Sequence, residues 1–377
     1  MTQPNVTNPD VSQSDILNAL LGIDDASPLA SLRAQRPEAT NHTAGSYRAL
    51  FVDTPTTAVT PIERFAAALR VAALHEEPAL AGHYAGQLRA TTESSEQLVA
   101  AVQDGASAAT LPPRLRAILA HADLLVIRPA AATPADLTAL RTAGLSDPEI
   151  VTISQLIAFV SFQLRVLIGL SLLRGDRRPV PATTLGPKDA TNAGFTQAEL
   201  GWAPWIAPVE AADATDEQRA VLPGQRIDSP YFRLLALDPP VLGERTATDL
   251  GIFYTHGGLP RPDRELAATV TSRVNGCIYC ASVHSRRAAQ LSGRTDDVQR
   301  LLDEGITTTL DDRWRAITDL AAALTVTPPA ATQDHLQRLR ELGLQDLDIL
   351  DTIQSAAFFS WANRLMLTLG EPVRPAQ

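Results

Sequence analysis

The amino-acid sequence predicts an all-α protein that contains two tandem copies of one helical domain. Apolar residues recur at gaps of three and four through long stretches, and this spacing places them on one face of a helix. Almost nothing alternates with a period of two, so we expect no strands. The two halves also match each other at a fixed register, which is typical of a duplicated unit.

The length and charge of the chain bound its class. A chain of 377 residues is too long for one typical core and suits two domains. The net charge is −10, which argues against general nucleic-acid binding because that function needs a basic face. The first residues show no basic segment followed by an apolar core, so we expect no secretory signal and a cytoplasmic location.

Composition along the chain predicts the domain boundaries. Residues 1–45 are rich in Thr, Pro, Asn and Ser, and we expect an N-terminal arm with a short helix at 15–21. A second irregular stretch, at 175–192, predicts the linker between domains. The first helical domain is therefore expected at 46–185 and the second at 186–377.

The internal repeat is visible in matched residues. The segment RLRAI at 114–118 matches RWRAI at 313–317, which sets the register at 199. The same register continues without a gap and pairs Arg165 with Arg364. Chance does not hold one register over such a length, so we infer duplication of a helical domain.

The repeated unit is expected to be helical throughout. In the first copy, helices are predicted at 113–126 and 134–141, followed by one long helix. The most apolar stretch, 150–173, contains Gln163 and Arg165, so we expect a buried helix that does not span a membrane.

The second copy places its cysteines at a helix start. A helix is predicted at 262–275, and the next begins after Gly276 and runs to about residue 291. The chain has only two cysteines, Cys277 and Cys280, which form no disulfide framework. In a cytosolic chain, two cysteines three positions apart indicate redox or metal chemistry.

The neighbours of the cysteines suit thiol chemistry. Cys280 and His284 are four residues apart and share a helix face, while Cys277 lies one turn earlier. A helix N-terminus stabilises a thiolate, and an imidazole can accept the thiol proton. The second cysteine can then attack a sulfenic acid. Glu265, on the preceding helix, would face His284 if the two helices pack antiparallel.

Other interpretations of these residues stay open at this point. Zinc is the main rival, because Cys277, Cys280 and His284 could supply three ligands. A purely structural cysteine pair is the second alternative. Glu265 and His284, each taken alone, are also typical of solvated helix residues. A thioredoxin fold is excluded, because it needs alternating strands and helices.

The spacing resembles the motif of the alkylhydroperoxidase D family, within the carboxymuconolactone decarboxylase-like superfamily. The motif is Glu, eleven residues, Cys, two residues, Cys, three residues, His, and it reads here as ELAATVTSRVNGCIYCASVH. The wider segment 265–290 resembles the peroxidase-related branch, as do the upstream stretches PWIAPVEAAD and SPYFRLLALDPPVLGERT, and the resemblance covers about 195–372. The family often has a second His between the cysteines, where this chain has Tyr279, a candidate supporting residue.

The resemblance implies roles for the four motif residues. Cys280 would be the peroxidatic thiol and Cys277 the resolving thiol that also supplies a proton. His284 with Glu265 would relay protons. No cofactor and no metal is implied.

The resemblance also implies a function and partners. The chain is expected to be an all-α, alkylhydroperoxidase D-like peroxidase, a thiol-dependent hydroperoxide or disulfide reductase in antioxidant defence. Its partners would be a hydroperoxide and a dithiol, thioredoxin-like or peroxiredoxin-like reductant, with no membrane or nucleic acid. Superfamily members usually form trimers or hexamers, so we expect a homo-oligomer, either a dimer or a trimer. The alternatives are a non-redox decarboxylase-like enzyme and a zinc-binding or interaction protein.

The first copy lacks the thiols. Aligning Pro61 with Pro262 puts Glu76 and Ala79 at the positions of the two cysteines. The same alignment puts His83 at the position of His284 and Arg64 at the position of Glu265. This copy cannot run the redox cycle, so we favour a structural role, with a binding site or a thiol-free, decarboxylase-like reaction as the alternatives.

Overall fold

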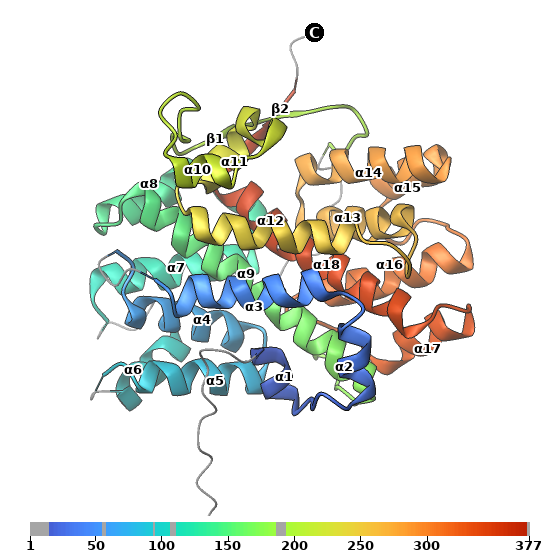
Figure 1. The fold of residues 1–377 in the computed structure, drawn as a ribbon, viewed down its shortest axis with the longest axis horizontal. Helices are drawn as coiled ribbons and strands as arrows, with labels where there is room; N and C mark the ends of the chain where they lie inside the picture. The colour runs from blue at the N-terminus through green and yellow to red at the C-terminus, as the bar shows by residue number, and fades with distance from the viewer. Residues whose placement is uncertain (1–14, 55–57, 93–94, 106–110, 186–193, 375–377) are drawn as a thin grey trace, which may run out of the picture.

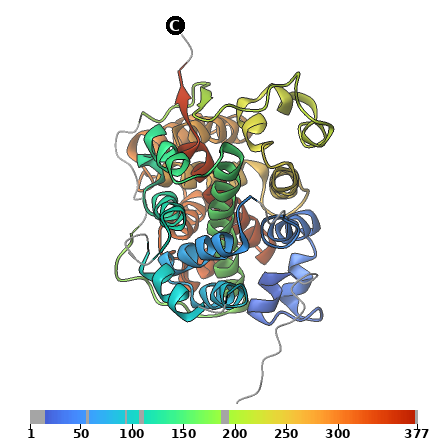
Figure 2. The ribbon, with the colours of Figure 1, turned by 90° about the vertical axis from the view of Figure 1, so that its left-hand side faces the viewer.

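Two long helices form the centre of the molecule. The computed structural model describes residues 15–54, 58–92, 95–105, 111–185 and 194–374 (Figure 1). Helices α9 (Asp147–Arg174) and α18 (Asp346–Thr368) pack against each other. Figure 2 shows α9 running through the middle of the molecule, with other helices on both sides of it.

The remaining elements surround this pair. In the first half they are α1 (Ile16–Leu21), α2 (Pro28–Arg33), α3 (Pro37–Phe51), α4 (Pro61–Leu74), α5 (Pro78–Arg89), α6 (Ser95–Asp104), α7 (Pro113–Ile127), η1 (Pro129–Ala131) and α8 (Pro134–Thr142). In the second half they are β1 (Gly201–Pro204), α10 (Asp216–Ala220), η2 (Gly224–Asp228), α11 (Pro230–Leu235), α12 (Pro239–Phe253), α13 (Arg261–Asn275), α14 (Ile278–Ser292), α15 (Thr295–Glu304), α16 (Asp312–Thr325), α17 (Gln333–Glu341) and β2 (Gly370–Val373). The all-α class predicted from the sequence is confirmed.

Helix order repeats between the halves. Helices α4, α5 and α6 begin at positions 61, 78 and 95, and α13, α14 and α15 begin at positions 261, 278 and 295. Helices α7, α8 and α9 begin at positions 113, 134 and 147, and α16, α17 and α18 begin at positions 312, 333 and 346. This correspondence agrees with a duplicated unit, and the duplication itself stays a prediction.

Helix α9 is long because its ends are capped and its sides are apolar. Ser146 and Glu149 form a capping box, in which the Ser146 backbone N–H donates to Glu149 Oε2 at 2.7 Å. The helix ends at Gly175, whose φ of 106° is left-handed. Within the described residues, α9 alone is long and apolar enough to cross a membrane, with mean hydropathy 2.1, and 94% of that window is buried inside the fold. The expected buried helix at 150–173 is therefore confirmed.

The two central helices approach each other closely. A Cβ placed on Gly169 would lie 2.2 Å from Ile353 Cγ2, so a larger residue does not fit there without movement. Trp361 is fully buried, and its ring centroid lies 5.2 Å from that of Phe159 and 5.5 Å from that of Phe162. Aromatic pairs at such separations add to the apolar burial.

A buried arginine also links the halves. Arg165 Nε donates to the Leu324 carbonyl at 2.8 Å, and its Nη2 donates to the Thr325 carbonyl at 2.7 Å. These carbonyls lie at the C-terminal end of α16, where backbone acceptors lack helical partners. The first half thus completes a helix of the second, and buried apolar residues of both halves form one cluster.

Two parts of the fold differ from the sequence prediction. The prediction of no strands is wrong for β1 and β2, which pair antiparallel with Gly201 opposite Val373. Each strand has four residues and contains a proline, so neither produces a visible alternation. The short helix predicted at 15–21 is present as α1, but the following residues to 45, expected to belong to an arm, contain α2 and the first part of α3, which packs along α12. Residues 1–14 lie outside the described part, and the domain boundaries stay predictions.

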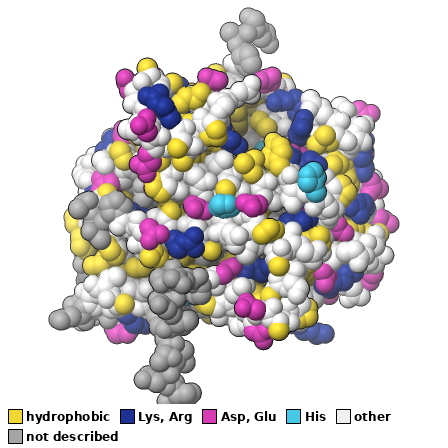
Figure 3. Space-filling model, viewed as in Figure 1, with side chains coloured by type: hydrophobic (Ala, Val, Ile, Leu, Met, Phe, Trp, Pro, Cys, Tyr) yellow, Lys and Arg dark blue, Asp and Glu magenta, His cyan; other side chains and the backbone are white. Residues whose placement is uncertain are grey.

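Charges are mixed on the face shown in Figure 3. Lys and Arg side chains are interspersed there with Asp and Glu. This face therefore presents no field of one sign.

Candidate redox site

A tight turn sets the position of the cysteines. Helix α13 ends at Gly276, whose φ of 80° is left-handed, and α14 begins two residues later and packs back against α13. A Cβ on Gly276 would lie 3.0 Å from the Cβ of Ala130. Both the backbone conformation and the available space therefore favour glycine here.

The two thiols face each other at the start of α14. Cys277 is the N-cap residue and Cys280 lies in the first turn. Both cysteines are free, and the Cys277 thiol donates to Cys280 Sγ across 2.9 Å. A disulfide needs about 2 Å between sulfurs, so small rotations of the side chains can close the pair.

His284 is held by a buried carboxylate on α13. Its Nδ1 lies 2.5 Å from Glu265 Oε2, and the Glu265 side chain is 1% exposed. Arg261 Nε donates to the other carboxylate oxygen at 2.6 Å. The structure therefore brings Glu265 and His284 together, as antiparallel packing of the two helices would require. Because Nδ1 is occupied, Nε2 is the ring nitrogen left for chemistry.

His284 and Glu265 both favour their charged forms although they are buried. Burial lowers the pKa of His284, but the Glu265 charge and hydrogen bond outweigh it and leave that pKa raised. Burial likewise raises the pKa of Glu265, and His284 and Arg261 outweigh it and leave that pKa lowered. The imidazolium form of His284 and the carboxylate form of Glu265 are therefore favoured beside the thiols.

The environment gives the two cysteine thiols different pKa values. Burial raises the pKa of Cys277 well above its ordinary value, and the neighbouring Cys280 sulfur adds to this effect. Burial also disfavours the Cys280 thiolate, but the Cys277 hydrogen bond and the His284 charge outweigh it and lower the pKa of Cys280. Cys280 is therefore the better nucleophile of the pair, and Cys277 holds its proton.

Two residues of α18 complete the surroundings of the motif. Asn363 is fully buried, and its side-chain hydrogen bonding lowers the pKa of both thiols. Phe359 packs edge-on against His284, with ring centroids 4.1 Å apart. Sequence reasoning gave Asn363 no role beyond a position on a helix face. The available signal was a polar residue in an otherwise apolar stripe, where the first half has Leu164 at the matching position.

A cavity opens beside Cys280. It has a volume of about 210 Å³ and lies between α11, α12, α14 and α18. Cys280, His284 and Tyr279 line it together with Ser229, Tyr231, Phe232, Arg245, Asp249, Val283, Phe358, Phe359, Ala362 and Met366. Cys280 is only 4% exposed, and this cavity is the approach to its sulfur that the described residues provide.

A second hollow lies on the other side of His284. It has a volume of about 280 Å³ and is lined by Glu265, His284, Tyr254, Arg261, Val283, Arg286, Arg287 and Gln290. His284 thus stands between this polar hollow and the cysteine cavity. Protons can exchange between the imidazole and the surface on this side without passing the thiols.

The described residues do not assemble a metal site. No group of three or more His, Cys, Asp and Glu side chains within that part of the chain is placed to hold a metal ion. The zinc alternative would need at least one ligand beyond Cys277, Cys280 and His284 Nε2.

The first half is aligned differently from the sequence prediction. Helix α5 begins at position 78 and α14 at position 278, and Glu76 adopts the left-handed φ of 53° where the second half has the left-handed Gly276. The alignment that placed His83 at the position of His284 is therefore wrong by one position. Pro61 lies at the first position of α4, whereas Pro262 lies at the second position of α13. Proline is accepted near a helix start and marks no register there.

In the corrected register, Glu77, Leu80, Tyr84 and Phe65 replace Cys277, Cys280, His284 and Glu265. Arg64 consequently corresponds to Arg264. Tyr84 is fully buried and donates to Gln163 Oε1 at 2.6 Å. His83 contacts the Tyr47 hydroxyl at 2.9 Å, and burial lowers its pKa to about 4. These contacts agree with a structural role for the first half.

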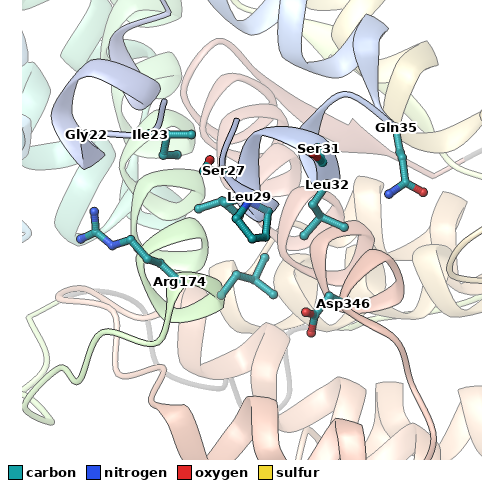
Figure 4. A pocket seen from close by; sticks show the side chains of 11 residues that line it. Gly22, Ile23, Ser27, Leu29, Ser31, Leu32, Gln35, Arg174 and Asp346 are labelled. Carbon is teal, nitrogen blue, oxygen red and sulfur yellow. The ribbon is translucent and has the colours of Figure 1, made fainter. Parts of the chain in front are cut away.

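Another cavity, at the C-terminal end of α9, is remote from the motif. Figure 4 shows it between the α1–α2 segment, the end of α9 and the start of α18, and its volume is about 460 Å³. It is lined by Gly22, Ile23, Ser27, Pro28, Leu29, Ser31, Leu32, Gln35, Leu173, Arg174 and Asp346. It shares no lining residue with the cysteine cavity and holds no Cys or His, so it adds nothing to the redox site.

Comparisons with known proteins agree with the motif. Residues 239–323 match the model of the carboxymuconolactone decarboxylase family, and this segment includes Glu265, both cysteines and His284. The resemblance to this superfamily is thereby confirmed. No curated protein matches the chain. Among solved structures, the chain is similar to an uncharacterized peroxidase-related protein from Silicibacter sp. TM1040, at 23% identity and a TM-score of 0.37, covering 49% of this chain and 94% of that one.

Proposed function

We propose that the carboxymuconolactone decarboxylase-like half of this chain is a thiol-dependent hydroperoxide reductase. The observation that supports this most directly is the hydrogen bond of 2.9 Å from the Cys277 thiol to Cys280 Sγ. It favours the thiolate form of Cys280, which lies beside His284 and at the wall of a cavity. Such an arrangement suits attack on a peroxide bond.

The first step oxidises Cys280. Its thiolate attacks the terminal oxygen of a hydroperoxide, so that an S–O bond forms as the O–O bond breaks. The alkoxide leaves with a proton from His284, giving an alcohol and a Cys280 sulfenic acid. The sulfur loses the two electrons that the peroxide gains.

The second step closes the disulfide. The Cys277 thiol gives up its proton, its sulfur attacks the Cys280 sulfur, and the sulfenic hydroxyl leaves as water. An external dithiol then reduces the Cys277–Cys280 disulfide to two thiols and is itself oxidised to a disulfide. A small dithiol, a thioredoxin-like protein or a partner peroxiredoxin fits this step.

The proton path runs through His284 and Glu265. Their hydrogen bond of 2.5 Å and the polar hollow beside them supply the route by which His284 is reprotonated after each turnover. Burial raises the pKa of Tyr279, so that residue serves only as a neutral hydrogen-bond donor. We therefore expect a shorter relay than in relatives with a second histidine, and modest turnover.

The test is hydroperoxide consumption with a dithiol donor. Cys280→Ser is expected to abolish it, and Cys277→Ser is expected to allow one oxidation of Cys280 without turnover. The matched control is Tyr84→Phe, at the first-half position equivalent to His284, which should leave the rate unchanged. Equal rates for wild type and Cys280→Ser would refute the proposal and favour the non-redox alternative.

A further inference from the structure

The cysteine cavity contains two buried donors that the protein leaves unsatisfied. Arg245, on α12, is 3% exposed, and its Nε has no hydrogen-bond partner among the described residues. Tyr231, on α11, is 8% exposed, and its hydroxyl also has no partner there. Both side chains line the cavity that contains Cys280.

The surroundings of Arg245 are aromatic. Its guanidinium carbon lies 5.0 Å from the ring centroid of Phe358, 5.5 Å from that of Tyr231 and 5.8 Å from that of Trp361. Ring faces stabilise the cation, but they accept none of its N–H groups conventionally. A buried guanidinium whose N–H groups lack hydrogen-bonded acceptors costs free energy, so its position beside a nucleophile points to a missing ligand.

The chemistry of the donors specifies that ligand. A guanidinium presents parallel N–H groups that match the two oxygens of a carboxylate, and a tyrosine hydroxyl can donate to the same oxygens. The rest of the wall is largely apolar, with Phe232, Phe359 and Met366. A volume of about 210 Å³ limits the ligand to a small molecule.

We propose that Arg245 and Tyr231 bind the carboxylate of the substrate, and that the cavity takes small organic hydroperoxides with an apolar skeleton and one carboxylate. This inference rests on the proposed reductase function and names its substrate class. The carboxylate anchors one end of the molecule while the peroxide group reaches Cys280. Arg245 and Tyr231 thereby determine specificity.

Asp249 lies one turn beyond Arg245 and carries the opposite charge. It also lines the cavity, and no ion pair joins it to Arg245 in the described structure. Burial raises the pKa of Asp249, and the charges of Arg245 and His284 act against this rise. In its ionised form Asp249 opposes an anionic substrate, so removing that charge should strengthen carboxylate binding.

The experiment compares two matched substrates. They are cumene hydroperoxide and its para-carboxylate, and the readout is the ratio of their kcat/KM values. Wild type should favour the carboxylate by about ten-fold to a hundred-fold, as expected for hydrogen bonds to a charged group. Arg245→Met should bring the ratio close to one, Tyr231→Phe should lower it several-fold, and Asp249→Asn should raise it.

A control variant distinguishes direct binding of the substrate carboxylate by Arg245 from long-range attraction by any nearby positive charge. Arg226→Met removes the same charge from a side chain that packs on Phe232 but does not line the cavity. It should keep most of the ratio. A wild-type ratio near one, or a ratio that survives in Arg245→Met, would overturn the inference.

A binding measurement keeps the inference separate from the peroxidase proposal. The inert analogue 4-isopropylbenzoate should protect Cys280 from alkylation in wild type and not in Arg245→Met, and neutral 4-isopropylbenzyl alcohol should protect neither. If Arg245→Met does not fold, Arg245→Lys replaces it and should weaken protection, because a lysine lacks the paired donors. If the analogue protects Cys280 but the protein consumes no peroxide, the proposed reaction is refuted and the carboxylate site stands. If the protein consumes peroxide but the analogue gives no protection, the carboxylate site is refuted and the proposed reaction stands.

Discussion

Replacing Glu265 by glutamine removes the charge that holds His284 protonated while keeping the shape of the side chain. In wild type the carboxylate lies 2.5 Å from His284 Nδ1 and is 1% exposed, so solvent screens the interaction little. Without it, burial lowers the pKa of His284, and the Cys280 thiolate loses its neighbouring positive charge. We therefore expect the pKa of Cys280 to rise in Glu265→Gln.

The size of the effect follows from the hydrogen bond that is lost. A hydrogen bond to a charged group is worth about 1.5–3 kcal/mol, which corresponds to roughly ten-fold to a hundred-fold in the thiolate population. The assay is the rate of Cys280 alkylation at pH 7 and its dependence on pH. Glu265→Gln should react slower by this factor, and its profile should move to higher pH.

The matched control lies on the same helix. Asp263→Asn also removes a buried carboxylate from α13, but Asp263 contacts Arg313 and Trp314 and no residue of the motif. It should reduce stability and leave the alkylation profile in place. An unchanged profile in Glu265→Gln, or one that moves to lower pH, would refute the account of the His284 charge.

Three further predictions concern stability and the thiols. Gly169→Ala should lower the free energy of unfolding by about 1–3 kcal/mol in urea denaturation, because its Cβ would overlap a side chain of α18, whereas Gly82→Ala, with no atom within 4 Å, should raise it by about 0.4–1 kcal/mol. Asn363→Leu should raise the pKa of both thiols and slow alkylation at neutral pH, and an unchanged profile would remove its assigned role. The stability lost in Glu265→Gln should be greatest between about pH 5 and pH 6.5, because a lowered carboxylate pKa stabilises above the unfolded value of about 4.3 and a raised pKa of His284 stabilises fully below about 6.5. Calorimetry should show this difference shrinking as pH falls below that window and as pH rises through the folded-state pKa of His284.

The core of the site could be predicted because its geometry is local. Cys277, Cys280 and His284 lie close together in the sequence, and helix periodicity alone places them along one side of α14. Glu265 needed one more assumption, that α13 and α14 pack antiparallel, and Gly276 makes that turn. Residues joined by one or two helical turns are therefore within reach of sequence reasoning.

Residues that reach the site only through tertiary packing could not be predicted from the sequence. Asn363 comes from α18, and Arg245 and Tyr231 come from elements upstream of α13. Nothing in the local pattern of these segments indicates that they meet Cys280. Their polar groups indicate a role in the site only once the structure shows that these groups are buried and which of them lack hydrogen-bond partners.

Register in the first half failed for a specific reason. Matching Pro61 with Pro262 implied an offset of 262 − 61 = 201, but α5 and α14 begin at positions 78 and 278, an offset of 278 − 78 = 200. A shift of one position moves a side chain by about 100° around a helix, which was enough to exchange His83 for Tyr84. Glu76 concealed the match, because a non-glycine residue seldom adopts the left-handed conformation found at Gly276.

The central claim is that Cys280 is the sulfur that a hydroperoxide oxidises first. The most direct test treats the Cys277→Ser variant with one equivalent of hydroperoxide in the presence of a sulfenic-acid trap, and locates the adduct by peptide mass spectrometry. We predict an adduct on Cys280 in this variant, and in wild type an intrachain disulfide with no adduct. Failure of Cys280 to react faster than an ordinary free thiol, or trapping at Cys277 in the converse Cys280→Ser variant at a comparable rate, would contradict the account.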